Sequence, residues 1–339
     1  MKKPSPLALL LLAFLSLACS PKAPAEVSQT EFVLGTVCSI RLLKGGDKAV
    51  IGKAIARLHE IEDELSVNKP GSQIDDVNAA AGKAPVAVGK EALDIVQRGI
   101  HYATLSQGSF DPSVGPLVKL WGIGSDHARL PSPAEVAAAR KLVNWKDISV
   151  DTAKGTIFLS RAGMALDLGS ATKGYAADEV ARILRAGGVK SAIIDLGGNV
   201  LALGPKPDGK PWRIGLQDPE GERGAYIGIA SLKDQTMVTS GIYERFFIQD
   251  GVRYHHILDT KTGYPVQNGL SSVTVIAPKS FDADGVTTML FALGREKGMA
   301  LARELKLSVI MLDDQHRVFM TPGVSAFFEI TDPRYKFSE

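Results

Sequence analysis

Apolar residues recur every three or four positions along several segments, and this spacing predicts amphipathic helices. The clearest case covers residues 48–65, where the apolar side chains share one face: Val50, Ile51, Ala54, Ile55, Leu58, Ile61 and Leu65. Further helices are predicted at 90–105, 133–142, 172–186, 282–293 and 297–305. A capping-box pattern at 132–135 begins one of them, and Gly294 ends another.

Shorter runs rich in β-branched and aromatic residues, bounded by turn residues, predict strands. They lie at 31–43 with Gly35 as a break, 191–196, 200–203, 212–217, 225–232, 237–239, 243–249, 252–257, 271–277, 309–312, 317–321 and 326–330, with a hairpin at 148–159. The segment 66–77 is polar and predicted as a loop. Prolines and glycines in 108–117 argue against regular helix or central strand. Because helices and strands do not alternate regularly, we expect an α+β fold with a largely antiparallel sheet packed by helices.

The N-terminus has the pattern of a targeting segment. Lys2 and Lys3 precede an unbroken apolar run at 7–15, which is too short to span a membrane. The run leads to Ala18 and Cys19, and this order resembles a bacterial lipoprotein signal, with lipid attached to Cys19. Secretion with simple cleavage nearby is the alternative. We therefore expect a signal peptide at 1–18, a tether at 19–30 and one folded domain at 31–332.

Composition narrows the function without identifying it. The chain has 339 residues, of which 45% are hydrophobic and 22% charged, with a formal net charge of +2. Removal of the segment with Lys2 and Lys3 would bring the charge close to zero, so electrostatics gives no reason to expect a nucleic-acid partner. Cys38 would remain as a single thiol in an apolar run, where it is expected to be a buried small hydrophobe and not a nucleophile.

The stretch 166–178 combines several features of an anion site. A strand end runs into Asp167, a turn of small residues follows, and Lys173 comes at the start of a predicted helix. A helix start offers unpaired N–H groups and a partial positive charge to an anionic group. Asp167 could hold a metal or accept a hydrogen bond. An ordinary strand-to-helix turn with a surface lysine is the alternative interpretation.

A second candidate lies at the start of the predicted helix 282–293. Asp284 and Thr288 are four positions apart and share one helical face. A carboxylate and a hydroxyl one turn apart suit a hard cation such as Mg²⁺, although an acid at a helix start is commonly a cap. The common nucleotide-binding glycine motifs are absent. His255 and His256 are adjacent, so on a strand they point to opposite faces and cannot easily serve one zinc ion.

Motifs across the chain, in their order, resemble the FAD:protein FMN transferase family, known as ApbE. The matching segments are 34–36, 110–117 with 120–122, 166–175, 197–199, 239–245, 255–259 with 262–265, and 283–288. The resemblance spans about 32–330 and implies a single ApbE-like domain. It also implies a reaction, in which FAD is split at its pyrophosphate, FMN passes to a threonine hydroxyl of a partner protein, and AMP leaves.

The resemblance also implies roles for individual residues. Asp284, Thr288 and the main-chain carbonyl of Ser170 would hold Mg²⁺, and Lys173 would meet phosphate charge. His256 would be the general base, although the sequence leaves open whether it or His255 faces the site. The expected flavin-nucleotide contacts are Leu34, Asn68, Ser109, Phe110, Asp111, Asp167, Lys173, His256 and Leu258.

By the same resemblance, the protein would be lipid-anchored on the periplasmic side of the inner membrane. Its acceptor would be a threonine-bearing subunit of a membrane redox complex. Two alternatives remain open: a lipoprotein that binds FAD without transferring FMN, and a Mg²⁺-dependent FAD pyrophosphatase in which water replaces the threonine.

Overall fold

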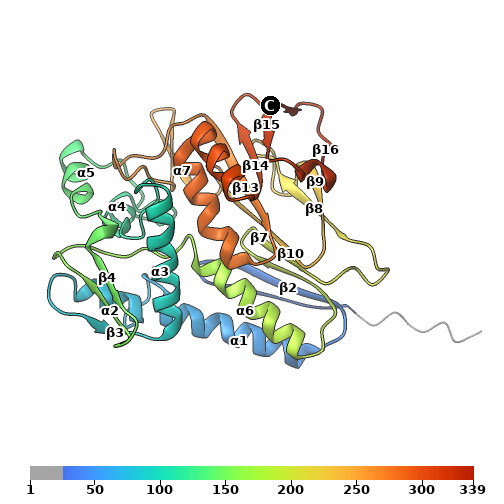
Figure 1. Cartoon of the computed structure of the whole chain (residues 1–339), viewed down its shortest axis with the longest axis horizontal. Helices are drawn as coiled ribbons and strands as arrows, with labels where there is room; N and C mark the ends of the chain where they lie inside the picture. The colour runs from blue at the N-terminus through green and yellow to red at the C-terminus, as the bar shows by residue number, and fades with distance from the viewer. Residues whose placement is uncertain (1–25) are drawn as a thin grey trace, which may run out of the picture.

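A nine-stranded sheet forms the centre of the molecule in the computed structural model, which describes residues 26–339 (Figure 1). Its neighbours are antiparallel except for the last pair, β15 and β17. The expected α+β fold with a largely antiparallel sheet is confirmed. In spatial order the strands are β1 (Val27–Val33), β2 (Thr36–Lys44), β6 (Ser191–Leu196), β7 (Asn199–Leu203), β10 (Gln235–Gly241), β13 (Leu270–Ala277), β14 (Ser308–Asp313), β15 (Arg317–Met320) and β17 (Lys336–Phe337).

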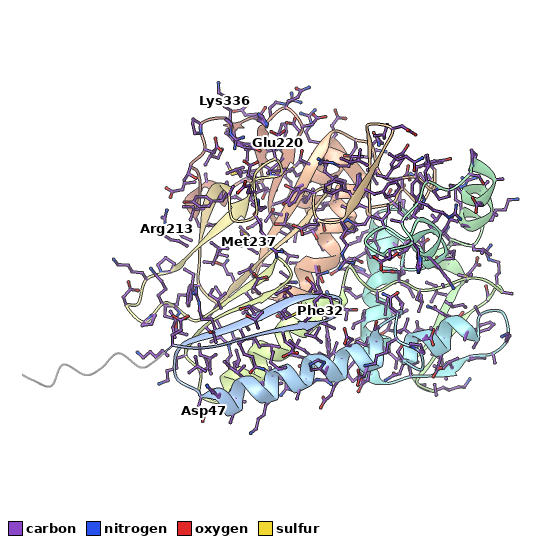
Figure 2. All side chains as sticks on the ribbon, turned by 180° about the vertical axis from the view of Figure 1, so that it is seen from behind. Phe32, Asp47, Arg213, Glu220, Met237 and Lys336 are labelled. Atoms are coloured by element: carbon purple, nitrogen blue, oxygen red, sulfur yellow. The ribbon has the colours of Figure 1, made fainter. Side chains whose placement is uncertain are left out.

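Three helices cover one face of this sheet: α1 (Lys48–Leu65), α6 (Thr172–Ala186) and α7 (Ser280–Glu304) (Figure 1). The predicted apolar face of α1 is buried except for Val50, which is half-buried. The Asp47 side chain caps the start of this helix (Figure 2). Gly294 interrupts α7 with non-helical dihedral angles, at the predicted break. Burial of each large aliphatic side chain contributes about 1.5–3 kcal/mol, so this layer fixes the helices firmly against the sheet.

The opposite face packs against a small sheet of β16 (Phe328–Ile330), β9 (Tyr226–Leu232) and β8 (Trp212–Gln217). Strand β13 is therefore enclosed on both faces, and every one of its residues is buried. Val273 and Val275 pack with α7, whereas Ile276 belongs to the cluster beneath the small sheet.

The remaining elements comprise α2 (Gln73–Ala79), α3 (Lys90–Leu105), α4 (Gly115–Trp121), α5 (Pro133–Arg140), a sheet of β3 (Val86–Ala87), β5 (Thr156–Leu159) and β4 (Ile148–Asp151), and a hairpin of β11 (Phe246–Gln249) and β12 (Val252–His255). The labelled elements α2 to α5, β3 and β4 lie at the left of Figure 1, on the side of α7 away from the small sheet of β8, β9 and β16. The loop before α4 is joined to the stretch before α6, because Asp167 N–H donates to the Pro112 carbonyl at 2.9 Å. This contact brings two predicted site segments together.

The predicted strand 31–43 was wrong, because the segment is a hairpin. Its turn is Leu34–Gly35, and both residues have positive φ angles, of 58° and 65°. Leucine rarely adopts this conformation, which explains why the sequence indicated only a break. Strand β1 also begins at Val27, inside the segment expected to be a tether.

Two predicted irregular segments contain helices. The segment 66–77 holds the start of α2, which the Ser72 side chain caps by accepting from Asp75 N–H. Helix α4 begins at Gly115 within 108–117, with Pro116 in its first turn. Proline is tolerated there because the first helical N–H groups need no helical acceptor.

Two further sequence predictions concern the two cysteines, Cys38 and Cys19. Cys38 is fully buried and burial raises the pKa of its thiol to about 12, which confirms the interpretation as a core residue. The predicted signal peptide and Cys19 lie outside the described residues. Within 26–339 no helix combines the length and the apolar character needed to cross a bilayer.

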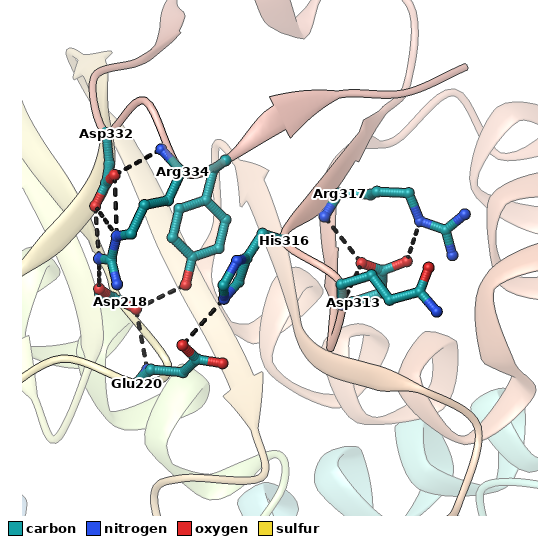
Figure 3. Close-up of polar contacts among 9 residues, drawn as sticks. Asp218, Glu220, Asp313, His316, Arg317, Asp332 and Arg334 are labelled. Carbon is teal, nitrogen blue, oxygen red and sulfur yellow. Dashed lines mark hydrogen bonds and ion pairs between the residues drawn. The ribbon is translucent and has the colours of Figure 1, made fainter.

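A polar network fastens the C-terminal segment to the small sheet (Figure 3). The buried Asp218 carboxylate accepts from the Tyr335 hydroxyl at 2.7 Å and from Glu220 N–H at 3.0 Å, and it pairs with Arg334. Although burial acts to raise the pKa of Asp218, these partners together lower it. Because β17 follows directly, the network holds the last strand at the sheet edge.

Candidate active site

The N-termini of α6 and α7 meet at the centre of the candidate site. Gly174 N–H, in the first turn of α6, donates to Asp284 Oδ2 at 2.7 Å. A Cβ at Gly174 would lie 2.5 Å from the Ser280 carbonyl oxygen and 2.7 Å from Asp284 Cβ, so only glycine allows this approach. The buried Asp284 carboxylate therefore caps a helix other than its own, as the N-terminal N–H groups require.

Asp284 keeps one oxygen available for a ligand. Its Oδ1 accepts no hydrogen bond from the described residues, and the side chain is only 4% exposed. Burial raises the pKa of Asp284, whereas the charge of Lys173 and the Gly174 N–H act in the opposite direction. A bound cation would relieve the cost of burying this charge.

Hydroxyl groups lie one turn further along α7. Thr288 Oγ1 is 3.1 Å from Ser240 Oγ of β10, and Ser240 Oγ is also 2.8 Å from Thr287 Oγ1. Thr287 Oγ1 donates to the Asp284 carbonyl at 2.6 Å. Ser240 was not predicted as a site residue, because its role depends on the pairing of β10 with its neighbours in space.

The Ser170 carbonyl, just before the start of α6, is the third oxygen expected to bind Mg²⁺. Ser170 precedes the N-cap residue Ala171, so its carbonyl has no partner within the helix, and no described residue donates to it. Within 26–339 no three His, Cys, Asp or Glu side chains gather closely enough to hold a metal. The candidate ligands are therefore one carboxylate and neutral oxygens, and Mg²⁺ completes such sets with water and substrate phosphates.

Lys173 places its positive charge among these groups. Its ammonium donates to the Gly169 carbonyl at 3.0 Å, which draws the side chain back over the small-residue turn. Its charge acts to lower the pKa values of Asp167 and Asp284. Burial is the larger effect and raises the pKa of Asp167, whose Oδ1 accepts from Gly169 N–H at 3.0 Å.

The structure distinguishes the two histidines. His255 is buried, with Nε2 2.9 Å from the Val266 carbonyl and Nδ1 accepting from Ile257 N–H at 3.3 Å. Strand β12 ends at His255, and the half-buried His256 follows it. Of the two, His256 is thus the histidine available to the site.

The Arg245 carbonyl determines the proton position on His256. His256 Nδ1 lies 3.3 Å from this carbonyl, which can only accept, so Nδ1 carries the proton and Nε2 keeps a lone pair. Burial, and next the charge of Arg245, lower the pKa of His256 to about 3. The Arg245 guanidinium also donates to the Gly35 carbonyl at 3.3 Å. Sequence reasoning included Arg245 in a motif but gave it no role.

The predicted nucleotide contacts come from several separate elements. Leu34 lies in the β1–β2 turn and its N–H donates to Glu62 Oε1 at 2.6 Å, whereas Asn68 is exposed in the turn after α1. Phe110 and Leu258 are buried in apolar clusters, at 7% and 8% exposure. Neither therefore presents an open surface.

The Ser109–Asp111 turn is organised by its own acid. Asp111 Oδ1 accepts from Ser113 N–H and from the Ser113 hydroxyl, at 2.8 and 2.6 Å, and Oδ2 accepts from Trp145 N–H at 2.9 Å. Burial raises the pKa of Asp111. Since both carboxylate oxygens already have partners, Asp111 shapes the turn, and a pocket of about 400 Å³ opens beside it.

The fold is thus an α+β sheet packed by helices, and the candidate site brings together the starts of α6 and α7, Lys173 and the buried Asp284. The sequence matches the model of the ApbE family over residues 34–311, and the chain belongs to this family. It is 37% identical to the FAD:protein FMN transferase of Treponema pallidum, covering 92% of this chain and 87% of that protein. A Klebsiella pneumoniae protein of the same name is 42% identical, over 76% and 80% of the two chains.

Solved structures agree with this assignment. The ApbE protein of Thermotoga maritima superposes with a TM-score of 0.82 at 30% identity, covering 89% of this chain and 99% of that one. The flavin transferase ApbE of Vibrio cholerae gives a TM-score of 0.81 at 30% identity, with the same coverage. The family expected from the motifs is confirmed.

The contact at Gly174 can be tested by Gly174→Ala. We expect the free energy of unfolding to fall by about 1–3 kcal/mol, because the new Cβ overpacks the contact between α6 and α7. Binding of FAD in the presence of Mg²⁺ should also weaken, because Asp284 is displaced. Urea unfolding and FAD titration measure the two effects.

Gly52→Ala is the matched control, since this glycine is exposed in α1 and a Cβ there meets nothing within 4 Å. The free energy of unfolding of this variant should rise by about 0.5–1 kcal/mol, because alanine favours a helix more than glycine does. Equal stability of Gly174→Ala and the unmodified protein would contradict the steric argument.

Proposed function

We propose that this protein transfers FMN from FAD to a threonine hydroxyl of an acceptor protein, in a Mg²⁺-dependent reaction that releases AMP. The observation that carries the proposal is the similarity, over most of the chain, to proteins named FAD:protein FMN transferase. These relatives are named as transferases that act on a protein. This chain has candidate residues for each role that phosphoryl transfer needs: metal ligands, a positive charge for the pyrophosphate and a general base.

The reaction exchanges one P–O bond for another. The threonine oxygen attacks the phosphorus on the FMN side of the pyrophosphate, and the bond to the bridging oxygen breaks, so that AMP leaves with that oxygen. Most of the catalysis in such a transfer is positioning and neutralisation of charge. Lys173, at the start of α6, is the side chain suited to hold the pyrophosphate, together with the helix N-terminus.

His256 is suited to accept the threonine proton. Its Nδ1 is committed to the Arg245 carbonyl, so Nε2 is the free acceptor. The same bond orients the ring, which general-base catalysis requires. Asp284, Thr288 and the Ser170 carbonyl would hold Mg²⁺, and the bound cation would supply positive charge against the pyrophosphate.

Lipid attachment and location belong to the same proposal. The N-terminal pattern supports a lipid on Cys19 and a position on the periplasmic side of the inner membrane. A membrane-held enzyme of this kind would act on a subunit of a membrane redox complex.

Changing Cys19→Ser tests the anchor. We expect the protein to move from the membrane fraction to the soluble periplasmic fraction, because the site of lipid attachment is lost. Fractionation and immunoblotting measure the distribution, with a Cys38→Ser variant as the control that retains Cys19. Retention of the Cys19→Ser protein in the membrane would contradict the lipid anchor.

Transfer itself is tested with a soluble form of the protein that begins at Ser20, together with FAD, Mg²⁺ and a peptide that carries an acceptor threonine. Intact-mass analysis should show FMN added to the peptide, and Asp284→Ala or removal of Mg²⁺ should abolish the gain. Asp282→Ala, two residues earlier and paired with Arg98, is the control that should stay active. Release of FMN and AMP without labelling would favour the pyrophosphatase, and FAD binding without turnover would favour the binding lipoprotein.

The pH dependence of transfer tests the role of His256. Since its pKa is lowered to about 3, the imidazole is already neutral at about pH 6, below the ordinary His pKa of about 6.5. The rate should therefore show no loss of base between about pH 8 and pH 6, and His256→Asn should reduce it about 10²–10⁴-fold. A falling limb near pH 6.5 that disappears in His256→Asn would contradict this assignment.

A further inference from the structure

A carboxylate on α6 caps the start of α7. Asp178, in the second turn of α6, accepts from Ser280 N–H through Oδ1 and from Phe281 N–H through Oδ2, each at 3.0 Å. The N-cap position of α7 is Lys279, which makes no side-chain cap of its own. Asp178 therefore supplies the cap that the sequence of α7 lacks.

The cap is the counterpart of the contact described above between Asp284 and Gly174. Each helix receives a carboxylate from the other: α6 is capped by Asp284 of α7, and α7 is capped by Asp178 of α6. The Ser280 hydroxyl also donates to Asn199 Oδ1 at 2.5 Å, so strand β7 contacts the first turn of α7 as well. The start of α7 is thus fixed relative to both the sheet and α6.

We infer that Asp178 is a positioning residue for the proposed metal ligands Asp284 and Thr288. Asp284 lies four residues, or about one helical turn, after Ser280. A shift of the first turn of α7 would therefore move the Asp284 carboxylate relative to Lys173 and the Ser170 carbonyl. The inference rests on the proposed function, because it assigns Asp178 to the Mg²⁺ site of that reaction.

A merely stabilising cap would behave differently from a positioning cap. Loss of a helix cap lowers the stability of the protein wherever the helix lies, and it leaves the affinity of a distant site unchanged. A positioning cap changes ligand affinity, since a displacement of about 1 Å in a reacting group can cost about 10²-fold in rate. Metal affinity measured separately from stability distinguishes the two.

The experiment compares Asp178→Asn with Asp282→Asn in the mature protein. Asparagine keeps one acceptor oxygen but replaces the other with an NH₂ group, which cannot accept from an α7 N–H. Asp282 is the matched control, because it is an acid in the first turn of α7 that pairs with Arg98 and caps nothing. Binding of Mn²⁺, as a probe for Mg²⁺, is measured by electron paramagnetic resonance, with thermal unfolding recorded in parallel.

We expect Asp178→Asn to weaken Mn²⁺ binding about tenfold or more, and Asp282→Asn to stay within about twofold of the unmodified protein. Amide exchange at Ser280 and Phe281 should accelerate in Asp178→Asn alone, because their acceptor is lost. If Asp178→Asn does not fold, Asp178→Glu keeps the charge with a longer stem and should show a smaller loss of affinity. Excess Mg²⁺ should restore part of the transfer rate.

Three results would overturn the inference. Unchanged Mn²⁺ affinity with lower thermal stability would assign Asp178 a stabilising role only. Equal losses in the Asp178 and Asp282 variants would indicate a general effect of charge. Absence of Mn²⁺ binding in the unmodified protein would remove the proposed metal site itself, and this failure is recognised before any variant is compared.

Discussion

The exchange of carboxylates between α6 and α7 is the constraint on which the site depends. Helix starts require acceptors for their free N–H groups, and here each helix obtains one from the other, through Asp284 and Asp178. The arrangement requires the helices to touch at Gly174, where a side chain would strike Ser280 and Asp284. One short contact thus sets the spacing of the groups that carry charge, and the large sheet behind it keeps both helices in place.

In this arrangement the Asp284 carboxylate is buried, which disfavours its charged form. Burial raises its pKa, and only the Lys173 charge and one N–H oppose that shift. A carboxylate in this state is incompletely compensated, and such groups concentrate at functional sites. The second oxygen, without a hydrogen bond, is available for a cation. Burial also acts on His256, but there it lowers the pKa and keeps the imidazole neutral. The single proton of the ring lies on Nδ1, which faces the Arg245 carbonyl.

Sequence patterns predicted most of the elements and only part of the site. Periodicity identified α1, α3 and α6, because their buried faces repeat within one helix. The β1–β2 hairpin was missed because its turn places a leucine at positive φ. The roles of Asp178, Ser240 and Arg245 were also missed, since each depends on partners from elements distant in sequence. The choice between His255 and His256 required the end of β12, which lies between them.

The distances along the chain between contacting residues have a consequence for folding kinetics. Strand β2 pairs with β6, whose residues follow more than a hundred positions later, and Gly174 and Asp284 are 110 positions apart. The polar network of the C-terminal segment joins Asp218 to Arg334 over 116 positions. Contacts of this kind require closure of long loops before they stabilise anything, so proteins that depend on them fold slowly. We therefore expect the active site to form late, and only after almost the whole chain is available.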